Sequence, residues 1–536
     1  MITRVPHGAL RSRIDSGFYA PNHLERERRL RQLGVMRIAI GEMASLVTDG
    51  THKTPNYVES GVPFLSATNI SNSALTFTDH KFVSRAEFLQ LRAWNCAPLP
   101  NDVVVAKSGS IGNAAVVPSH APEFAVFESV AIVRCDRFDP YYLGTFLNSR
   151  IGQEEIKRQT KGAVIRHLHL EDLREVEVPE FSKEAQLYIG DKVRQAERLR
   201  ERARNLEFAA RASTIDLVRG PSTASEAAKN LERAISGKQA RPLEPVQGSP
   251  GRPGVLRSRV RPSAMFGRLN AEAYQQDYLD NDRALLASGW RLTRLADLVT
   301  APINNSIRGV TEHLSPDSRG VPMFRPADID GLWMNDSSAP RISAAFEQQH
   351  AKARVEPGDI VLAIAGTVAA VGRIGESVAF GNINGSSARV RVETPLRGFV
   401  LLFLASDFGQ RELMRWAVGS VQKHLNLEDL TEVRVPEIPL ELCAPFESAL
   451  QLSGRAHDGS KALVEAGTAL VELLIEGRVS EADLVAAQKG LEAGDLRADR
   501  EILKALRQCG AHDGRPLVAD VDALHALLDE LGGQDA

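Results

Sequence analysis

The sequence predicts an α+β fold that is built twice along one chain. The stretch 161–179 returns as 418–436, and its landmark residues keep a spacing of 257 positions: Gly162 and Gly419, His167 and His424, Pro179 and Pro436. In both copies short strand-like runs alternate with helix-like runs, and a long amphipathic pattern follows. A register kept over this length in a chain of 536 residues indicates a duplicated unit.

Composition restricts the class of protein. The chain is long enough for several domains, each with its own core. Its 65 basic and 68 acidic residues leave a net charge of −3, which argues against a wholly basic nucleic-acid coat but allows a local basic face. The first residues lack an apolar signal segment, and the longest apolar run, 399–405, is too short to span a bilayer. We therefore expect a cytoplasmic protein without a membrane partner.

The cysteines indicate neither a disulfide framework nor a zinc site. All four lie far apart and none forms a CxxC pair: Cys96, Cys135, Cys443 and Cys509. This pattern favours reduced thiols in a cytosolic protein.

The two copies have the same order of elements. Each begins with a charged helical lead-in that ends at a glycine, continues with strands and a small-residue loop, and closes with a helix. In the first copy these are the helix 24–33, the strands 61–65 and 102–106, the loop 107–112 and the helix 141–156. In the second they are the helix 274–288, the strands 320–324 and 359–363, the loop 364–368 and the helix 400–413.

A long amphipathic helix is predicted after each copy. Apolar residues recur at steps of three and four across 182–219, with charged residues between them, which is typical of a coiled-coil-like seam. The second helix keeps this register but carries Gly454, Gly459 and Gly467. Glycine weakens a helix, so we expect the second helix to need a partner.

These patterns divide the chain into consecutive segments. Residues 237–263 contain Pro, Gly and Arg without periodicity, which indicates a linker, and nothing in the first half matches the helical tail after 478. The predicted segments are a lead-in 1–34, a domain 35–181, a central long helix 182–236, a linker 237–267, a second domain with its lead-in 268–437, a second long helix 438–477 and a C-terminal extension 478–536.

A search for catalytic motifs mostly fails. The sequence has no GxxxxGK[ST] phosphate loop, and its Gly-rich loops lack the spacing of a dinucleotide fingerprint. The run from Asp102 to Lys107 resembles part of a metal-dependent nuclease, but Val105 stands where a second carboxylate is needed. His167 and His169 lack acids or cysteines at ligand spacing, and Asn426 replaces the second histidine in the other copy. We expect no metal, no cofactor and no catalytic residue.

Two acidic pairs invite a catalytic interpretation. Glu171-Asp172 and Glu428-Asp429 have the composition of general acid–base pairs. Both lie at the front of a short predicted helix, where carboxylates offset the positive end of the helix dipole. The structural interpretation is therefore preferred.

Basic and polar loop residues are the strongest functional candidates. Lys and Arg suit phosphates or guanine edges, and Asn and Gln suit adenine edges. Each one alone is more often a solvated surface residue, but these residues differ between two similar frames, which favours the reading of two different DNA sequences. The candidates are Thr51, His52, Lys53, Lys107, Ser108, Arg166, His167, Asn305, Arg308, Arg325, Gln422, Lys423 and His424.

The repeated motifs, in their order, resemble the specificity subunit of a type I restriction–modification system. They are the Gly-Val-Pro openings at 61–63 and 320–322, the Pro-x-Asp strands at 100–102 and 357–359, the Leu-rich signatures ending at Pro179 and Pro436, and the long helices. The resemblance covers about 14–477. It implies a tandem pseudo-symmetric repeat of two α/β target-recognition domains, each followed by a long helix, with the two helices paired as an antiparallel coiled coil.

The resemblance also implies partners and a role in defence against foreign DNA. They are double-stranded DNA with a bipartite site, two DNA methyltransferase subunits and a restriction or translocase subunit, while the chain itself lacks an active site. The long linker and the tail leave open an ordinary type I system or a related methylation-linked phage-defence system. Two alternative functions also stay open: an enzyme, and a protein-binding scaffold with incidental DNA contact.

Overall fold

The computed structural model describes residues 19–32, 34–71, 73–77, 79–159, 167–237, 271–306, 314, 320–419, 422–507 and 516–532. The chain forms two compact units. The first comprises Met1–Leu199 with Gly459–Asp529, and the second comprises Arg200–Asp458 with Glu530–Ala536. Mixed helices and strands confirm the predicted combination of both element types. Within the described ranges, no helix is both long and apolar enough to cross a membrane.

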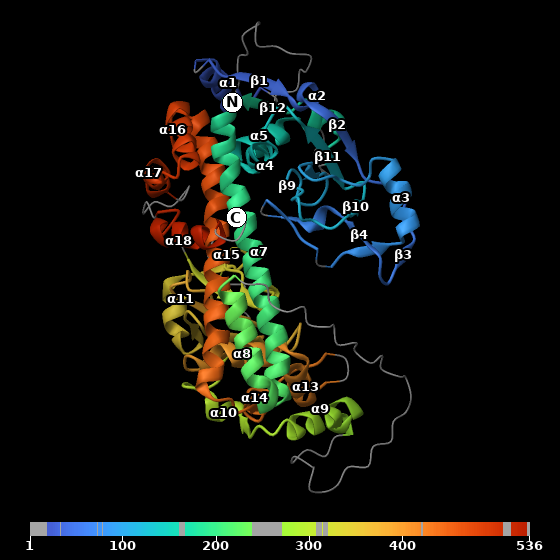
Figure 1. Cartoon of the computed structure of the whole chain (residues 1–536), viewed down its shortest axis with the longest axis vertical. Helices are drawn as coiled ribbons and strands as arrows, with labels where there is room; N and C mark the ends of the chain where they lie inside the picture. Colours follow the sequence, from blue (N-terminus) through green and yellow to red (C-terminus); the bar gives the residue numbers. More distant parts are fainter. Residues whose placement is uncertain are drawn as a thin grey trace. The chain divides into compact units, whose positions relative to one another are not determined.

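The first unit contains a lead-in helix, a strand-rich body and helices that pack on it (Figure 1). Its helices are α1 (Pro21–Gln32), α2 (Ile40–Met43), α3 (Arg85–Ala93), α4 (Pro140–Asn148), α5 (Arg150–Gln159) and α6 (Leu170–Arg174), with the 3-10 turn η2 (Ala67–Asn69). Its strands are β1 (Met36–Ala39), β2 (Ala44–Asp49), β3 (Tyr57–Val58), β4 (Val62–Leu65), β5 (Ile70–Ser71), β6 (Ala74–Leu75), β7 (Lys81–Val83), β8 (Val103–Ala106), β9 (Ala114–Val116), β10 (Ala125–Val126), β11 (Val130–Cys135) and β12 (Glu177–Glu180).

These strands form two four-stranded sheets and two strand pairs. One sheet has the order β2-β11-β8-β9 and the other β10-β4-β7-β3. Strands β8 and β9 are buried along their whole length, which agrees with the continuous apolar run of β8. Strand β1 pairs antiparallel with β12, so that Met36 lies opposite Glu180 and the two ends of the body meet at one point.

The second unit has a comparable set of elements. Its body contains η4 (Ala271–Tyr274), α9 (Gln276–Ala287), α10 (Leu295–Leu298), η6 (Pro326–Asp328), α11 (Ala344–Gln349), η7 (Ala351–Ala353), α12 (Leu396–Ala405), α13 (Asp407–Trp416) and α14 (Leu427–Thr431). Its strands are β13 (Leu292–Arg294), β14 (Val321–Phe324), β15 (Ile329–Asp330), β16 (Trp333–Met334), β17 (Arg341–Ile342), β18 (Arg354–Val355), β19 (Ile360–Ala363), β20 (Val371–Arg373), β21 (Gly381–Ile383), β22 (Ser387–Val390) and β23 (Arg434–Pro436).

The strands of the second unit form a four-stranded sheet, a five-stranded sheet and one closing pair. The sheets have the orders β17-β14-β21-β18 and β15-β16-β20-β19-β22. Strands β19 and β22 are fully buried. Strand β13 pairs antiparallel with β23, which places Leu292 opposite Pro436 and again brings the ends of the body together.

The closing helix of each body is interrupted, which corrects the single helices predicted over 141–156 and 400–413. Helix α4 ends at Asn148, and the hydroxyl of Ser149 then accepts a hydrogen bond from the Gly152 amide as α5 begins. A Cβ atom at Gly152 would lie 1.9 Å from the Phe146 carbonyl oxygen, so the turn between the helices requires glycine. Ser406 caps α13 in the same way in the second unit.

A buried charge cluster fixes the lead-in helix α1 to the first unit. Arg158 on α5 is almost fully buried and pairs with Glu27 on α1 at 2.8 Å. Arg37 on β1 lies between Glu27 and Glu177 of β12, 2.6 Å from the latter. The cluster therefore joins α1, α5 and the closing strand pair. Glu27 of the docked α1 adds to the charge that Glu155 of α5 already places beside Arg158.

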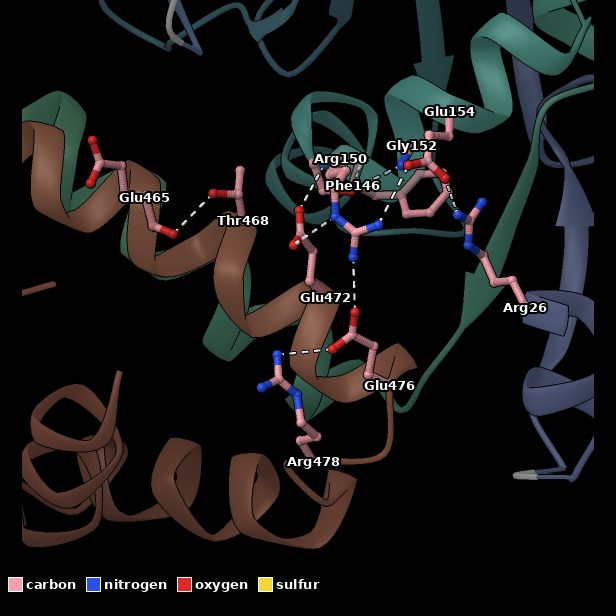
Figure 2. Close-up of polar contacts among 11 residues, drawn as sticks. Arg26, Phe146, Arg150, Gly152, Glu154, Glu465, Thr468, Glu472, Glu476 and Arg478 are labelled. Carbon is pink, nitrogen blue, oxygen red and sulfur yellow. Dashed lines mark hydrogen bonds and ion pairs between the residues drawn. The ribbon is translucent and has the colours of Figure 1, made fainter. Parts of the chain in front are cut away.

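A second set of ion pairs connects α1 and α5 to the helix α15 (Leu440–Ile475). Figure 2 shows Arg150 at the start of α5 directed towards Glu472 and Glu476 of α15. Its backbone amide donates to Glu472 at 2.8 Å and its guanidinium donates to Glu476 at 2.9 Å. On the other side Glu154 pairs with Arg26 of α1.

The second unit fixes its lead-in helix α9 by a related cluster. Arg415 on α13 is buried and donates to both carboxylate oxygens of Asp282 on α9, at 2.7 and 3.0 Å. Arg434 on β23 reaches the same Asp282 and also Glu412 on α13, the latter at 2.6 Å. Both clusters hold an arginine of the closing helix against an acid of the lead-in.

The central helical segment, predicted as one helix over 182–236, consists of two helices. Helix α7 (Lys183–Arg219) stops before Gly220, whose φ of 145° is accessible only to glycine, and α8 (Pro221–Ile235) follows. Helices α7 and α15 lie side by side in each unit (Figure 1). In the first unit a Cβ at Gly459 would lie 3.1 Å from Leu199. In the second unit Ser453 donates to Glu207 at 2.7 Å.

The C-terminal extension as far as Asp529 belongs to the first unit. Helices α16 (Glu481–Glu492), α17 (Arg497–Ala505) and α18 (Val521–Gly532) follow α15. Asp499 of α17 is buried and accepts a hydrogen bond from Tyr188 on α7 at 2.6 Å. It also pairs with the fully buried Lys192 of α7 and, at 3.0 Å, with His525 of α18. These bonds hold the pKa of Asp499 below its ordinary value despite burial.

We predict that the substitution Asp499→Asn destabilises the first unit by about 3 kcal/mol, because it leaves the ammonium group of Lys192 buried without a counter-charge. The double variant Lys192→Met with Asp499→Asn is expected to recover part of this loss. Thermal and urea unfolding of the full chain measure both. An unchanged unfolding transition in Asp499→Asn would show that the buried pair does not hold the tail.

His23 on α1 gives a second prediction. It lines a cavity of about 20 Å³ beside Arg26 and Arg158, and burial followed by these two positive charges lowers its pKa to about 4. An unfolded histidine has a pKa of about 6.5. Between this pH and the lower pKa of the folded state, the unfolded chain binds a proton that the folded chain does not. The stability of the first unit should therefore fall as the pH decreases from about 6.5 to about 4.

The substitution His23→Gln is expected to reduce this pH dependence, because glutamine does not titrate. Urea unfolding of both proteins at a series of pH values checks it, and pH 8, where His23 is neutral in both states, provides the reference. Equal slopes for the two proteins would contradict the assignment.

Candidate functional site

Backbone hydrogen bonds bring the candidate loops of the first unit to one end of the β2-β11-β8-β9 sheet. The Lys107 amide donates to the Ser129 carbonyl at 2.7 Å, and the Leu168 amide donates to the Lys107 carbonyl at 3.1 Å. Thr51 forms a parallel bridge to Phe127. The segments 49–53, 107–108, 127–129 and 167–169 therefore meet. We call this the first loop end.

Side-chain burial divides the candidates at the first loop end. Lys107 is buried and pairs with Asp49 at the end of β2. Thr51 is also buried, and its hydroxyl accepts from the Lys53 amide at 3.1 Å, so it shapes the turn. Ser108 is half-buried. Thr51 and Lys107 therefore have partners within the protein, whereas the sequence predicted that their side chains would be exposed for contact with DNA.

The side chains that face solvent at the first loop end are polar but not uniformly basic. Lys53 and His167 are exposed. His52 is also exposed and pairs with Glu128 at 2.8 Å and with Asp49 at 3.4 Å. Neither acid is among the residues predicted from the sequence, although Asp49-Gly50 is a typical turn pair. Arg166 lies outside the described residues.

A matching set of backbone bonds forms the second loop end, at the end of β19 in the second unit. The Ile364 amide donates to the Ser386 carbonyl and the Leu425 amide donates to the Ile364 carbonyl, both at 2.9 Å. Asn304 forms a bridge to Arg389 beside them. The segments 304–305, 364–365, 386–389 and 424–425 therefore meet.

The candidates in the second unit have different environments. Gln422 and Lys423 are exposed, whereas Asn305 and His424 are half-buried. The backbone of His424 exchanges two hydrogen bonds of 2.8 Å with Val418. Arg308 lies outside the described residues.

Arg325 is bound by an acid within its own turn. It follows β14, and its guanidinium donates to both carboxylate oxygens of Asp328, at 3.0 and 2.9 Å. These hydrogen bonds raise the pKa of Arg325. A guanine edge would have to compete with this bidentate partner.

The acid of the nuclease-like run is occupied by an ion pair. Asp102 is buried and accepts two hydrogen bonds from Arg134, at 2.8 and 2.7 Å, and one from the Leu99 amide. Asp359 is bound in the same way by Arg391 in the second unit. A carboxylate saturated in this way stabilises the strand ends. The pairs Glu171-Asp172 and Glu428-Asp429 lie in the first turns of α6 and α14, as the helix-dipole interpretation predicted.

Comparison with known proteins gives a consistent result. No protein-family model matches the chain. The type I restriction enzyme EcoBI specificity subunit of Escherichia coli is 26% identical over 191 residues, which are 34% of this chain and 39% of that protein. The chain resembles type I specificity subunits. The resemblance inferred from the repeated motifs is thus confirmed, over well under half of the relative's length.

Solved structures of the same kind align over most of the chain. The S subunit of a type I restriction–modification system from M. genitalium is 14% identical, with a TM-score of 0.37, and the alignment covers 82% of this chain and 95% of that one. The HsdS subunit from Thermoanaerobacter tengcongensis is 18% identical, with a TM-score of 0.25, over 83% of this chain and 97% of that one.

Two lysines of the first loop end should differ in their effect on stability. Lys107→Met removes the partner of the largely buried Asp49 and should cost about 3 kcal/mol. Lys53→Met changes an exposed residue and should stay within about 0.5 kcal/mol of the parent. Urea unfolding of the two variants tests the contrast. Equal and small effects would mean that the Lys107–Asp49 pair does not support the loop end.

Proposed function

We propose that the chain is a non-catalytic DNA sequence-recognition subunit of a restriction–modification or methyltransferase complex, and that it reads a bipartite target. The curated relative is named as a specificity subunit, and its similarity to this chain supports the assignment. DNA, two methyltransferase subunits and a restriction or translocase subunit are the proposed partners.

One observation carries this proposal most directly. At both loop ends the residue after the central buried strand, Lys107 or Ile364, accepts a backbone hydrogen bond from the leucine of the signature stretch, Leu168 or Leu425. The backbone frame is therefore alike, while the side chains on it differ. Two like frames with different polar side chains suit a protein that reads two different half-sites.

We further propose that the two bodies are copies of one fold and that α7 and α15 pair as an antiparallel coiled coil. The closing pairs β1–β12 and β13–β23 support the first part. The second part is supported by contacts whose positions rise on one helix as they fall on the other. In the first unit Val193 lies near Gly467 and Leu199 near Gly459, and in the second unit Glu207 binds Ser453.

DNA affinity in this proposal comes partly from phosphate contacts and partly from the assembly. The net charge of −3 and the acids beside His52 give the chain little general attraction for DNA. Exposed cations such as Lys53 and Lys423 would then supply local phosphate contacts, and binding should weaken as salt increases. Association with methyltransferase subunits adds further contacts to the same duplex.

Exchanging the first body for that of another specificity subunit should change one half of the methylated sequence and leave the other half unchanged. The junctions belong in the closing pair, because Met36 lies opposite Glu180 and one graft point serves both ends. The donor should carry an arginine at the position of Arg158, since Glu27 of α1 stays in the recipient. Methylome sequencing of cells that express the complete system measures the result.

Two outcomes would contradict the proposal. A wholly altered or wholly unchanged methylated sequence would exclude two independent readers. A scaffold with incidental DNA contact predicts that Lys53→Glu with Lys423→Glu leaves modification intact. The matched control is Lys489→Glu, which changes a charge on α16 in the tail.

A further inference from the structure

A polar joint in the second unit connects its recognition body to both long helices. Glu207 of α7 accepts hydrogen bonds from Trp333 Nε1 of β16 at 2.7 Å and from Ser453 Oγ of α15 at 2.7 Å. His457 Nε2 of α15 lies 2.9 Å from the same carboxylate oxygen. Although burial opposes the charge, these partners hold the pKa of Glu207 below its ordinary value. A single carboxylate thus binds the sheet and the second helix.

The indole ring of Trp333 is also held by shape. A Cβ atom at Gly454 of α15 would lie 2.7 Å from the ring, so the sheet approaches the helix at a point where only glycine fits. His457 packs against the same ring edge-on, with centroids 6.1 Å apart. The glycine that weakens α15 as a helix therefore makes room for the joint.

A buried ion cluster beside the ring strengthens the attachment. Arg373 of β20, which pairs with β16 at Trp333, is almost fully buried and donates to both carboxylate oxygens of Glu447 on α15 at 3.0 Å. Arg397 of α12 donates to Glu447 as well, at 2.7 Å. Bidentate geometry restricts orientation as well as distance.

The first unit carries different residues at the matching positions. Ala74 on β6 stands where β16 has Trp333, since β6 pairs with β5 as β16 pairs with β15. Val116 and Gly190 stand 257 positions before Arg373 and Glu447. None of these three side chains can form the ion pairs or the indole bond. The first body binds α7 through α4, where Tyr141 donates to Glu197 at 2.7 Å.

We propose that Trp333, Glu207 and Gly454 are positioning residues that set the orientation of the second recognition body on the long helices, and thereby the spacer length that the protein accepts between its half-sites. This inference rests on the proposed function. It assigns spacer selectivity to the attachment of the second body, separately from the loop residues that contact bases. Breaking the joint should relax the spacer without changing the bases read.

The test uses the full chain assembled with its methyltransferase subunits on duplexes whose spacer is native, one base pair longer or one base pair shorter. Gly454→Ala displaces the ring while raising the helix propensity of α15. Trp333→Phe keeps a ring but removes the N–H donor. Gly467→Ala is the matched control, because it brings the same gain in propensity to the same helix, with the nearest atom 3.3 Å away.

Gly454→Ala and Trp333→Phe are each expected to lose about tenfold of the preference for the native spacer, while both half-site sequences remain unchanged. Gly467→Ala should retain the preference. Thermal unfolding of each variant separates this effect from a loss of structure. Retention of the full preference by both Gly454→Ala and Trp333→Phe would overturn the inference and leave the proposed function standing. A wild-type complex without a split target would instead refute the proposed function itself.

Discussion

Each body holds a buried arginine of its closing helix against an acid from its lead-in helix. Moving a guanidinium group such as that of Arg158 or Arg415 out of water costs several kcal/mol unless a counter-charge meets it. Glu27 and Asp282 provide that charge from helices that precede the bodies in sequence. Docking of the lead-in and burial of the closing helix are therefore coupled.

In each unit a second arginine from the closing strand pair joins the cluster, and it comes from a different strand in each unit. In the first, the additional arginine is Arg37 on β1, and it faces Glu177 on β12. In the second, the equivalent position on β13 is Leu292, because Leu292 lies opposite the closing proline as Arg37 does in the first. The additional arginine of the second unit is therefore Arg434, which comes from β23. The requirement is an added positive charge beside two acids, and either strand of the closing pair can supply it.

Sequence patterns predicted local elements better than they predicted side-chain environments. The buried strand 102–106 and the helix stop at Gly34 follow from apolar runs and from the conformational freedom of glycine, which are local properties. The burial of Lys107 depends on Asp49, 58 positions away, and that of Lys192 depends on Asp499, 307 positions away. A lysine in a loop looks available until the partner that encloses it is known. The break between helices at Ser149 also has a local cause, but this serine lies within an apolar pattern that is typical of one continuous helix.

The loop ends and the attachments of the bodies obey different constraints. Main-chain hydrogen bonds such as Leu168 to Lys107 form the frame of a loop end, and they do not depend on which side chains those positions carry. The attachment of a body to the long helices depends on particular side chains, because Glu207 requires the indole of Trp333 and the ring requires Gly454. Substitutions of exposed loop-end residues such as Lys53 can therefore accumulate without loss of the fold, whereas a substitution at the joint removes contacts that attach the body. Under the proposed function, such a protein can acquire a new recognised sequence through its exposed loop residues while its geometry on DNA stays constant.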